Sequence, residues 1–469
     1  MKKIEFVNKK LIELNNFLSK SKIAIIGLGV SNIPLLDYMY NLKANVTVFD
    51  DREIEKIPKE ILDKVTEYNF KFSYGPNSLN KLNGFDIIFR SPSCMPTKKE
   101  LVAEEERGTI IITEIEMFMK LFPGKVIGIT GSDGKTTTTT LVYEILKNNG
   151  YNCYLGGNIG IPLFTKLNLM RPEDIAVLEL SSFQLMNMEI SQDISIITNI
   201  APNHLNIHSS YEEYIDAKKN IFKYQDNNGL VVLNYDNDIT RECRNEAEGK
   251  VILYSGQTKL EDGIILDNNV IKICKDKIRR HIIKTDELKL RGKHMHENAC
   301  AAIAATSSFV EPDKAARIIK DFAGVEHRIE LVRELNSVKW YNDSIASSPT
   351  RTIAGLNSFE ERITLIAGGY DKNLDYTPLA EPILNKVENL ILIGQTAKKI
   401  LNAVKEETKK QKKEIKIYQC ETLEDAVLVS KKVTGMGNVV LLSPASASFD
   451  MFKDFADRGN KFKELVNNL

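Results

Sequence analysis

The chain has 469 residues, of which 43% are hydrophobic and 27% are charged, a composition typical of globular proteins and not of disordered or fibrous ones. At roughly 150 residues per domain, this length predicts about three domains. The 63 basic residues are matched by 63 acidic ones, so no net positive charge attracts nucleic acid, and none is expected as a partner. The lysine cluster at 409–413 is interpreted as a solvated helix face.

The six cysteines are scattered and form no Cys-x-x-Cys pair, which argues against a zinc site and against a disulfide framework. No stretch approaches the roughly 18 uncharged apolar residues that a membrane span needs. The basic N-terminus lacks the apolar segment and small-residue cleavage site of a signal peptide. We therefore expect a soluble, cytoplasmic protein with no membrane span.

Short apolar runs alternate with longer helical patterns along almost the whole chain. This alternation is typical of β-α-β units and predicts an α/β fold with mostly parallel sheets. Three stretches resemble the opening of a nucleotide-binding α/β unit, in agreement with the length. The predicted domains are residues 1–114, 115–323 and 324–469.

The first unit opens with an apolar strand at 23–26 that leads directly into the turn Gly27-Leu28-Gly29-Val30-Ser31-Asn32. A second strand, at 46–49, ends in Asp50-Asp51-Arg52. The pattern resembles a dinucleotide-binding fingerprint, but Asn32 takes the place of the third glycine. An NAD-dependent oxidoreductase is therefore not supported. A phosphate-binding turn at a helix N-terminus and a tight turn without a ligand both remain open.

The second unit begins with the strand 126–130, followed by Gly131-Ser132-Asp133-Gly134-Lys135-Thr136-Thr137. Glycines let successive backbone N–H groups converge on phosphate oxygens, the lysine neutralises charge, and the hydroxyl of Thr136 can bind Mg²⁺. Ile129 stands where the usual pattern has a glycine, six residues before Lys135. The sequence predicts a shortened phosphate-binding loop, and the alternative is an ordinary glycine-rich turn.

Two further strands end in residues that can bind a metal ion. The strand 175–178 leads to Glu179, and the strand 194–199 leads to His204. A carboxylate at the carboxyl end of a buried strand lies where open α/β sheets bind ligands. Glu179 could equally cap the next helix, and His204 could be a structural residue. After them, Ser210-Tyr211-Glu212-Glu213 predicts a capping box at the start of a helix.

In their order along the chain, these motifs resemble the Mur ligase family, whose members use ATP to join amino acids to the peptidoglycan precursor. Further matching motifs are Gly157-Asn158-Ile159-Gly160, Glu179-Leu180-Ser181-Ser182-Phe183-Gln184, His327-Arg328, Asn342-Asp343-Ser344, Gly368-Gly369-Tyr370-Asp371-Lys372 and Leu442-Ser443-Pro444-Ala445-Ser446-Ala447-Ser448-Phe449. The last of them, together with Arg458-Gly459-Asn460, is similar to the members that add D-glutamate.

The resemblance implies three domains: a Rossmann-like N-terminal domain for the UDP part of the substrate, a central P-loop-type ATPase domain with a mostly parallel sheet, and a Rossmann-like C-terminal domain for the amino acid. It implies that ATP phosphorylates the terminal carboxylate of UDP-N-acetylmuramoyl-L-alanine. The amine of D-glutamate then attacks the acyl phosphate, and an amide bond forms. The expected partners are these small molecules, and the chain is expected to act as a monomer.

The resemblance also assigns roles to residues. Catalysis would depend on Lys135, Glu179, His204 and Lys218. Two Mg²⁺ ions would be bound by Thr136, Glu179, His204 and Lys218, the last as a carbamate. ATP would be bound by Gly131, Ser132, Asp133, Gly134, Lys135, Thr136, Thr137, Asn298, Arg328 and Asp343. The UDP substrate would be bound by Val30, Ser31, Asp51, Arg52, Asn158 and Ser181, and D-glutamate by Ser347, Lys372, Ser448, Phe449 and Phe455.

Some positions leave alternatives open. Taken without the resemblance, Lys218 would be interpreted as a solvated surface lysine beside Lys219. Ile345 stands where some D-glutamate-adding members have a lysine, and Ser347 where they have a threonine, so the amino acid itself is not fixed. The alternative functions are a sibling ligase with another amino acid, a non-catalytic nucleotide-binding regulator on the same scaffold, and a plain P-loop phosphotransferase.

Overall fold

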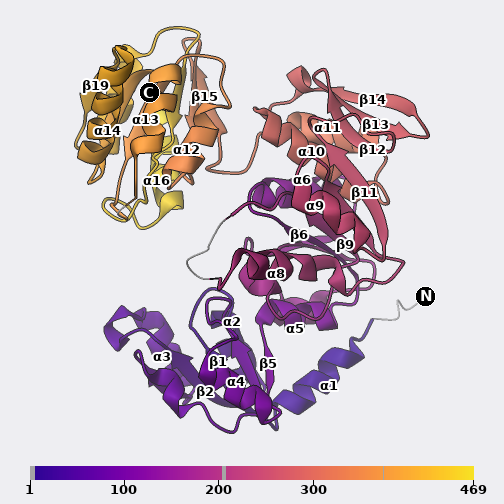
Figure 1. Ribbon diagram of the computed structural model, residues 1–469. Coiled ribbons are helices and arrows are strands. Elements are labelled where there is room, and N and C mark those ends of the chain that lie inside the picture. Colours follow the sequence, from indigo (N-terminus) through magenta and orange to yellow (C-terminus); the bar gives the residue numbers. More distant parts are fainter. Residues whose placement is uncertain (1–5, 203–207, 373) are drawn as a thin grey trace. The chain divides into compact units, whose positions relative to one another are not determined.

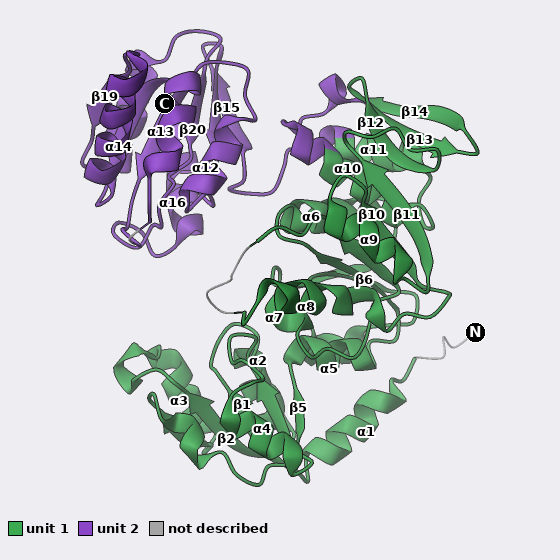
Figure 2. Ribbon diagram, in the orientation of Figure 1, with its two compact units in different colours: residues 1–283, 297–319 green, residues 284–296, 320–469 purple. Residues whose placement is uncertain are grey.

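A computed structural model describes residues 6–202, 208–372 and 374–469. They form three sheets, each flanked by helices (Figure 1). The chain divides into two compact units, residues 1–283 with 297–319 and residues 284–296 with 320–469 (Figure 2). The three sheets are mostly parallel, which confirms the predicted α/β class.

The first sheet has five parallel strands in the order β3-β2-β1-β4-β5. Its strands are β1 (Lys22–Ile26), β2 (Asn45–Asp50), β3 (Lys71–Tyr74), β4 (Ile87–Arg90) and β5 (Ile110–Ile112). The helices of this part are α1 (Lys9–Leu18), α2 (Ile33–Asn41), α3 (Lys59–Glu67) and α4 (Lys99–Glu106). The strand order reverses between β1 and β4, and open α/β sheets bind ligands at such a point, outside the carboxyl ends of the strands.

The central sheet has nine strands in the order β14-β13-β12-β11-β10-β9-β6-β8-β7. The strands from β7 to β12 are parallel, whereas β12 and β13 form an antiparallel pair. The strands are β6 (Lys125–Thr130), β7 (Cys153–Gly157), β8 (Ile175–Glu179), β9 (Ile194–Ile197), β10 (Leu230–Asn234), β11 (Lys250–Ser255), β12 (Gly263–Asp267), β13 (Val270–Lys275) and β14 (Ile278–Lys284). Every residue of β8 and β9 is buried, as expected of parallel strands covered on both faces.

The helices that accompany the central sheet are α5 (Glu114–Leu121), α6 (Lys135–Asn148), α7 (Ser182–Leu185), α8 (Tyr211–Lys223), α9 (Asp238–Glu242), α10 (Lys293–Thr306) and α11 (Pro312–Asp321). The predicted capping box at α8 forms only in part. Ser210 Oγ accepts a hydrogen bond from the Glu213 N–H at 3.1 Å, but the Glu213 carboxylate accepts from the N–H of Ser209 instead of that of Ser210. The complete capping box is at α7, between Ser181 and Gln184.

The third sheet has six strands in the order β15-β16-β20-β17-β18-β19. All neighbours are parallel except β15 and β16. The strands are β15 (Glu330–Leu335), β16 (Val338–Asn342), β17 (Ile363–Gly368), β18 (Val387–Ile393), β19 (Lys416–Gln419) and β20 (Val439–Leu442). The helices are α12 (Pro349–Leu356), α13 (Thr377–Lys386), α14 (Ala397–Gln411), α15 (Leu423–Val433) and α16 (Phe455–Asn467).

All six cysteines are free, as the sequence predicts. Lys409 and Lys410 are exposed at the end of α14, as predicted, whereas Lys412 is the C-cap of that helix and Lys413 follows it, so only part of the lysine cluster lies on a helix face. No helix in the described part of the chain is long and apolar enough to cross a membrane.

Candidate active site

The predicted phosphate loop joins β6 to α6, so the expected sequence of strand, loop and helix is present. Gly131 and Gly134 have φ angles of 150° and 79°, in a region that residues with a side chain rarely adopt. A Cβ at Gly131 would lie 1.9 Å from Thr198 Oγ1, and one at Gly134 would lie 2.4 Å from Asn298 Oδ1. Both glycines are therefore needed for backbone conformation and for space, and Asn298 lies directly against the loop.

The end of β9 holds the loop in place. The N–H of Ser132 donates to the Asn199 carbonyl at 2.9 Å, and the N–H of Asp133 donates to Asn199 Oδ1 at 2.9 Å. The hydroxyl of Thr198 donates to the Asp133 carbonyl. Sequence analysis gave no role to Thr198 or Asn199, although polar residues that end a buried strand beside the phosphate loop are a signal that could have identified them.

The side chain of Ser132 is also part of this support. Its Oγ donates to the Ala201 carbonyl at 2.9 Å, accepts from the Ala201 N–H at 2.9 Å, and lies 2.8 Å from the Tyr214 hydroxyl on α8. With its one proton donated to Ala201, Ser132 accepts from Tyr214. The hydroxyl of Ser132 therefore fastens the loop to β9 and α8.

Two lysines converge on one carbonyl of the loop. Lys135 Nζ donates to the Gly131 carbonyl at 2.9 Å and to that of Ser132 at 3.0 Å. Lys218 Nζ, from α8, donates to the same Gly131 carbonyl at 2.8 Å and to Thr130 Oγ1 at 3.3 Å. The structure therefore places two lysine side chains beside the predicted phosphate site.

Lys218 is only 1% exposed, so the interpretation as a solvated surface lysine is wrong. Burial lowers the pKa of Lys218 well below its usual value, and the positive charge of Lys135 lowers it further. The Tyr214 ring lies 4.7 Å from the Lys218 ammonium. Lys219 instead pairs with Glu246 at 2.6 Å. A lysine with a depressed pKa has a larger fraction of neutral, nucleophilic amine.

Glu179 ends β8, the strand beside β6, and is 1% exposed. Its Oε1 accepts from Asn158 Nδ2 at 2.8 Å, and its backbone carbonyl accepts from the Asn158 N–H at 2.7 Å. Among the described residues, its Oε2 has no hydrogen-bond partner. Glu179 does not cap α7, because Ser181 does. A buried carboxylate oxygen left unpaired suits a hard cation such as Mg²⁺.

Other predicted metal ligands lie in the same part of the chain. Thr136 is partly exposed in the first turn of α6, and the neighbouring hydroxyls of Thr137 and Thr138 are buried and unpaired among the described residues. His204 lies outside the described residues. Within the described ranges, no three His, Cys, Asp or Glu side chains gather as a metal-binding cluster. Among the described residues, a cation site here would use hydroxyl and carboxylate oxygens.

The turn after β1 is closed by residues that the fingerprint did not predict. Asn32 Nδ2 donates to the Ile26 carbonyl at 2.9 Å and to the Gly27 carbonyl at 3.1 Å, which explains an amide side chain where a glycine is usual. Asp50, at the end of β2, accepts from the Leu28 N–H at 2.8 Å and from Arg52 Nε at 2.7 Å. Burial raises the pKa of Asp50, but the bonds from Arg52 and Leu28 outweigh it and leave that pKa below its usual value.

The predicted UDP contacts lie around this turn. Val30 is 76% exposed, Ser31 is partly exposed, and Asp51 is exposed beside Arg52. Sequence analysis chose Asp51 and missed Asp50, which is the carboxylate that fixes the turn. A buried acid at the end of a strand is the signal that could have revealed it.

In the second unit, the predicted amino-acid contacts follow the carboxyl ends of neighbouring strands. Lys372 follows β17, and Ser448 and Phe449 follow β20. Lys372 Nζ lies 5.4 Å from the centre of the Phe449 ring, which is 58% exposed. Ser448 is buried. Ser347 is partly exposed between β16 and α12, and Phe455 is 40% exposed at the start of α16.

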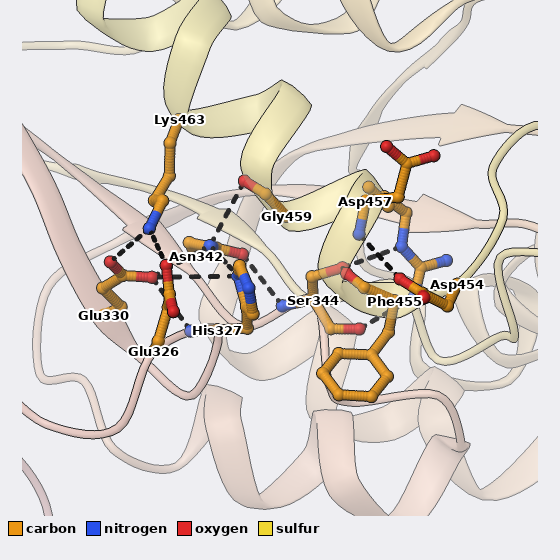
Figure 3. A network of polar contacts seen from close by, with 11 residues as sticks. Glu326, His327, Glu330, Asn342, Ser344, Asp454, Phe455, Asp457, Gly459 and Lys463 are labelled. Carbon is orange, nitrogen blue, oxygen red and sulfur yellow. Dashed lines mark hydrogen bonds and ion pairs between the residues drawn. The ribbon is translucent and has the colours of Figure 1, made fainter. Parts of the chain in front are cut away.

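A polar network around the buried residues His327, Asn342 and Ser344 supports this edge of the third sheet (Figure 3). His327 Nδ1 accepts from Asn342 Nδ2 at 2.9 Å, and the His327 N–H donates to Glu330 Oε2 at 2.9 Å. Burial lowers the pKa of His327. A Cβ at Gly459 would lie 2.3 Å from His327 Nδ1, so only a glycine lets α16 approach the imidazole at this position, and the Phe455 ring of α16 makes an edge contact with the same imidazole.

Arg458, the neighbour of that glycine, is 1% exposed and bonds to backbone and hydroxyl oxygens. Its Nε donates to Ser344 Oγ at 2.9 Å and its Nη2 to the Ser344 carbonyl at 2.8 Å, while Nη1 donates to the carbonyls of Ser446 and Ala447 at 3.1 Å. Burial lowers the pKa of Arg458 to about 10. Sequence analysis gave it no role, yet it joins the segments after β16 and β20.

The predicted ATP contacts Arg328 and Asp343 also belong to the second unit. Asp343 is buried at the end of β16, and its Oδ2 accepts from Ser443 Oγ at 2.7 Å. Burial raises the pKa of Asp343 to about 7, and the bond from Ser443 and the positive charge of Arg328 act in the opposite direction.

Three family models match the chain in succession: the N-terminal domain of MurD-like Mur ligases at residues 21–113, the Mur ligase middle domain at 129–306 and the Mur ligase glutamate ligase domain at 327–446. The chain belongs to the Mur ligase family. Relatives named UDP-N-acetylmuramoylalanine–D-glutamate ligase align with it from end to end. That of Acetivibrio thermocellus is 48% identical, with 99% of this chain and 100% of the relative covered, and that of Ruminiclostridium cellulolyticum is 46% identical with the same coverage.

Solved structures show the same fold at low sequence identity. The UDP-N-acetylmuramate–alanine ligase of Thermotoga maritima superposes with a TM-score of 0.59 at 18% identity, and 96% of this chain and 99% of that chain are covered. MurF ligase of the same organism, in complex with ADP, gives a TM-score of 0.55 at 16% identity, with both chains fully covered.

Proposed function

We propose that this chain catalyses the ATP-dependent formation of an amide bond between UDP-N-acetylmuramoyl-L-alanine and D-glutamate in the synthesis of the peptidoglycan precursor. The observation that carries the proposal is the 46–48% identity, over 97–99% of the chain, to relatives named for this reaction. The central site supports it, because Lys135, Lys218 and Glu179 lie on adjacent elements around one phosphate-type loop.

The chemistry requires two anions to approach each other. A carboxylate is a poor electrophile, so its oxygen first takes the terminal phosphoryl group of ATP and becomes an acyl phosphate. The amine of D-glutamate then attacks the acyl carbon, and phosphate leaves. Lys135, held 2.9 Å from the Gly131 carbonyl, supplies positive charge where the phosphoryl group is transferred. The N-terminus of α6 adds its dipole to this charge.

The residues present fit a role in binding Mg²⁺. Glu179 offers a buried, unpaired oxygen, and Thr136 lies in the first turn of α6. We assign these two residues, His204 and a carbamate on Lys218 to the binding of two Mg²⁺ ions. Mg²⁺, when bound, neutralises the charge of the phosphates. The depressed pKa of Lys218 favours the neutral amine that reacts with carbon dioxide to form a carbamate.

The other proposed contacts follow the three sheets. The turn after β1 would bind the UDP group through Val30, Ser31, Asp51 and Arg52, and Asn158 and Ser181 would hold the muramoyl part. Asn298, Arg328 and Asp343 would contact ATP. We propose that the domain boundaries lie near residues 114 and 323 and that the chain acts as a monomer in the cytoplasm, where its nucleotide substrates are made.

The test is phosphate release by the purified protein. We expect release from ATP only when UDP-N-acetylmuramoyl-L-alanine and D-glutamate are both present, and the product should be larger than the acceptor by one glutamyl residue. Equal release without any amino acid would indicate a phosphotransferase, and none under any condition would indicate a regulator. A panel of amino acids tests the sibling ligases, because Ile345 and Ser347 leave that choice open. Higher turnover with L-alanine or a diamino acid would identify that amino acid, and not D-glutamate, as the substrate.

A further inference from the structure

Two buried charged side chains that the proposed chemistry does not use lie where the first sheet meets the central sheet. Arg90 ends β4, and Glu114 begins α5; each is 4% exposed. Within the described part of the chain, neither forms a salt bridge. Burying an unpaired charge is costly unless hydrogen bonds satisfy it, so the bonds that these two groups make indicate what they hold.

Glu114 binds the backbone of the segment that follows the predicted muramoyl-binding loop. Its Oε1 accepts from the Phe164 N–H at 2.8 Å, and the Leu163 N–H bonds to the same carboxylate. Burial raises the pKa of Glu114 to about 7, while these two N–H groups act to lower it. Residues 158–164 run from Asn158, which bonds to Glu179, to Phe164, which bonds to Glu114. Glu114 therefore holds one end of this stretch, and the other end contacts Glu179, the proposed metal ligand.

The ring of Phe164 carries this link into the first sheet. It is fully buried, and its centre lies 5.0 Å from that of Tyr38 on α2 and 6.2 Å from that of Phe89 on β4. Helix α2 starts directly after the turn that carries Val30 and Ser31. The carboxylate of Glu114 therefore holds the Phe164 segment in place, so that its ring packs between the loop that contains Asn158 and helix α2, which follows the predicted UDP-binding turn.

Arg90 makes a second link of the same kind. It pairs in register with Ile26 of β1, the last residue before the turn. Its Nη2 donates to the Met186 carbonyl at 3.3 Å, and its Nη1 donates to the Cys94 carbonyl at 3.2 Å. Met186 is the C-cap of α7, the short helix that Ser181 caps at its N-terminus. The guanidinium thus ties the second predicted muramoyl-binding segment to the first sheet.

We infer that Arg90 and Glu114 are positioning residues for the UDP-linked substrate: they set the spacing between the turn after β1 and the two central loops, so that one ligand can bind to both. The inference rests on the proposed function. A ligand that spans two sheets gains binding energy from both ends only when their separation is fixed beforehand. ATP and the amino acid do not depend on this spacing, so their binding is not expected to change.

The test is the set of KM values of Glu114→Ala. We expect KM for UDP-N-acetylmuramoyl-L-alanine to rise about tenfold, while KM for ATP and for D-glutamate change less than about twofold. Glu114→Gln keeps an acceptor oxygen for the backbone N–H groups, so it should return KM to within about threefold of the wild type. Calorimetric titration with the UDP substrate alone should show the same order of affinities.

Glu104→Ala is the matched control. Glu104 is fully buried and also accepts two backbone N–H groups, those of Gly84 and Phe85 at 3.1 Å, but both belong to the first sheet's own connections. Both alanine variants should lower the melting temperature, and only Glu114→Ala should change KM for the UDP substrate. A folded Glu114→Ala protein with wild-type KM for that substrate, or with all three KM values raised alike, would overturn the inference.

If Glu114→Ala does not fold, Arg90→Met decides the question, since it keeps the length of the side chain and removes the bond to the Met186 carbonyl. The same selective rise in KM supports the inference, and an unchanged KM refutes it. Failure of the proposed function is seen separately, because the wild-type protein would then release no phosphate in response to D-glutamate before any variant is compared.

Discussion

The phosphate loop of the central sheet and the carboxyl edge of the third sheet differ in which of their side chains are buried. In the central sheet, two of the groups proposed to act in catalysis are themselves buried: Lys218 and Glu179 are each 1% exposed, and Lys135 is partly buried. In the third sheet, the proposed amino-acid contacts Lys372 and Phe449 are exposed, whereas the buried Arg458 bonds to the segment after β20 that carries Phe449.

This difference indicates what each region can contribute. Charges that are removed from water and held in place interact strongly with a reacting group, because the local dielectric is low and no reorganisation is needed. An exposed lysine interacts more weakly and is screened by salt, so it adds affinity more than rate. Substitutions in the central site should therefore lower kcat, and those at the third sheet should raise KM for the amino acid.

The largest effect is expected for Lys218→Ala. The variant loses the group proposed to carry the carbamate, and kcat should fall by about 1000-fold, the scale of a lost electrostatic group at a reacting centre. Short carboxylic acids should restore part of the rate, because they return an anion to the space left by the side chain. Lys219→Ala, which removes only the pair with Glu246, is the control and should keep its activity. Full activity of Lys218→Ala without rescue would exclude this lysine from the site.

Glu179→Gln should have the second largest effect. The amide keeps the shape and the bond to Asn158 but loses the negative charge, so kcat should fall by about 100-fold and the Mg²⁺ concentration needed for half-maximal rate should rise. A titration of rate against MgCl₂ measures both. Glu173→Gln, at an exposed position before β8, should match the wild type. An unchanged Mg²⁺ dependence in Glu179→Gln would remove Glu179 from the metal site.

The two regions also differ in how far the sequence predicted them. The glycines, Lys135 and Glu179 follow apolar runs directly, so local patterns predict the strand, loop and helix. The support from Asn199 depends on β9 pairing with β6, more than sixty residues away, and no local pattern contains that register. The burial of Lys218 was predictable, since Tyr214, Lys218 and Ile221 share one face of α8 at helical spacing. The adjacent Lys219 obscured that pattern.

Lys372→Ala tests the role proposed for the exposed residues of the third sheet. Removing one exposed cation near Phe449 should raise KM for D-glutamate by about tenfold and leave kcat within a factor of about two. Raising the ionic strength should reduce the difference between the variant and the wild type, since salt screens an exposed charge. Lys398→Ala, an exposed lysine at the start of α14, serves as the control. A fall in kcat as large as that of Glu179→Gln would show that the two regions do not divide their roles in this way.

The smallest effect concerns Asp343, a buried group of the third sheet whose influence should appear in stability. Its pKa is raised to about 7 in the folded protein, so the folded state keeps a proton that the unfolded chain has already lost. Above the unfolded pKa, near 4, stability therefore decreases as the pH rises, and this decrease ends once the pH passes 7. Between pH 6 and pH 7, this group should lower the free energy of unfolding by about 1 kcal/mol.

Urea denaturation of the wild type and of Asp343→Asn at both pH values isolates this contribution, because the asparagine cannot titrate. The wild type should lose more stability than the variant over this interval. Equal losses would mean that Asp343 is ionised in the folded protein at pH 6, with its charge balanced by Arg328. The third sheet would then hold a buried charge at its ligand-binding edge as the central sheet does, and the contrast between the two regions would no longer hold.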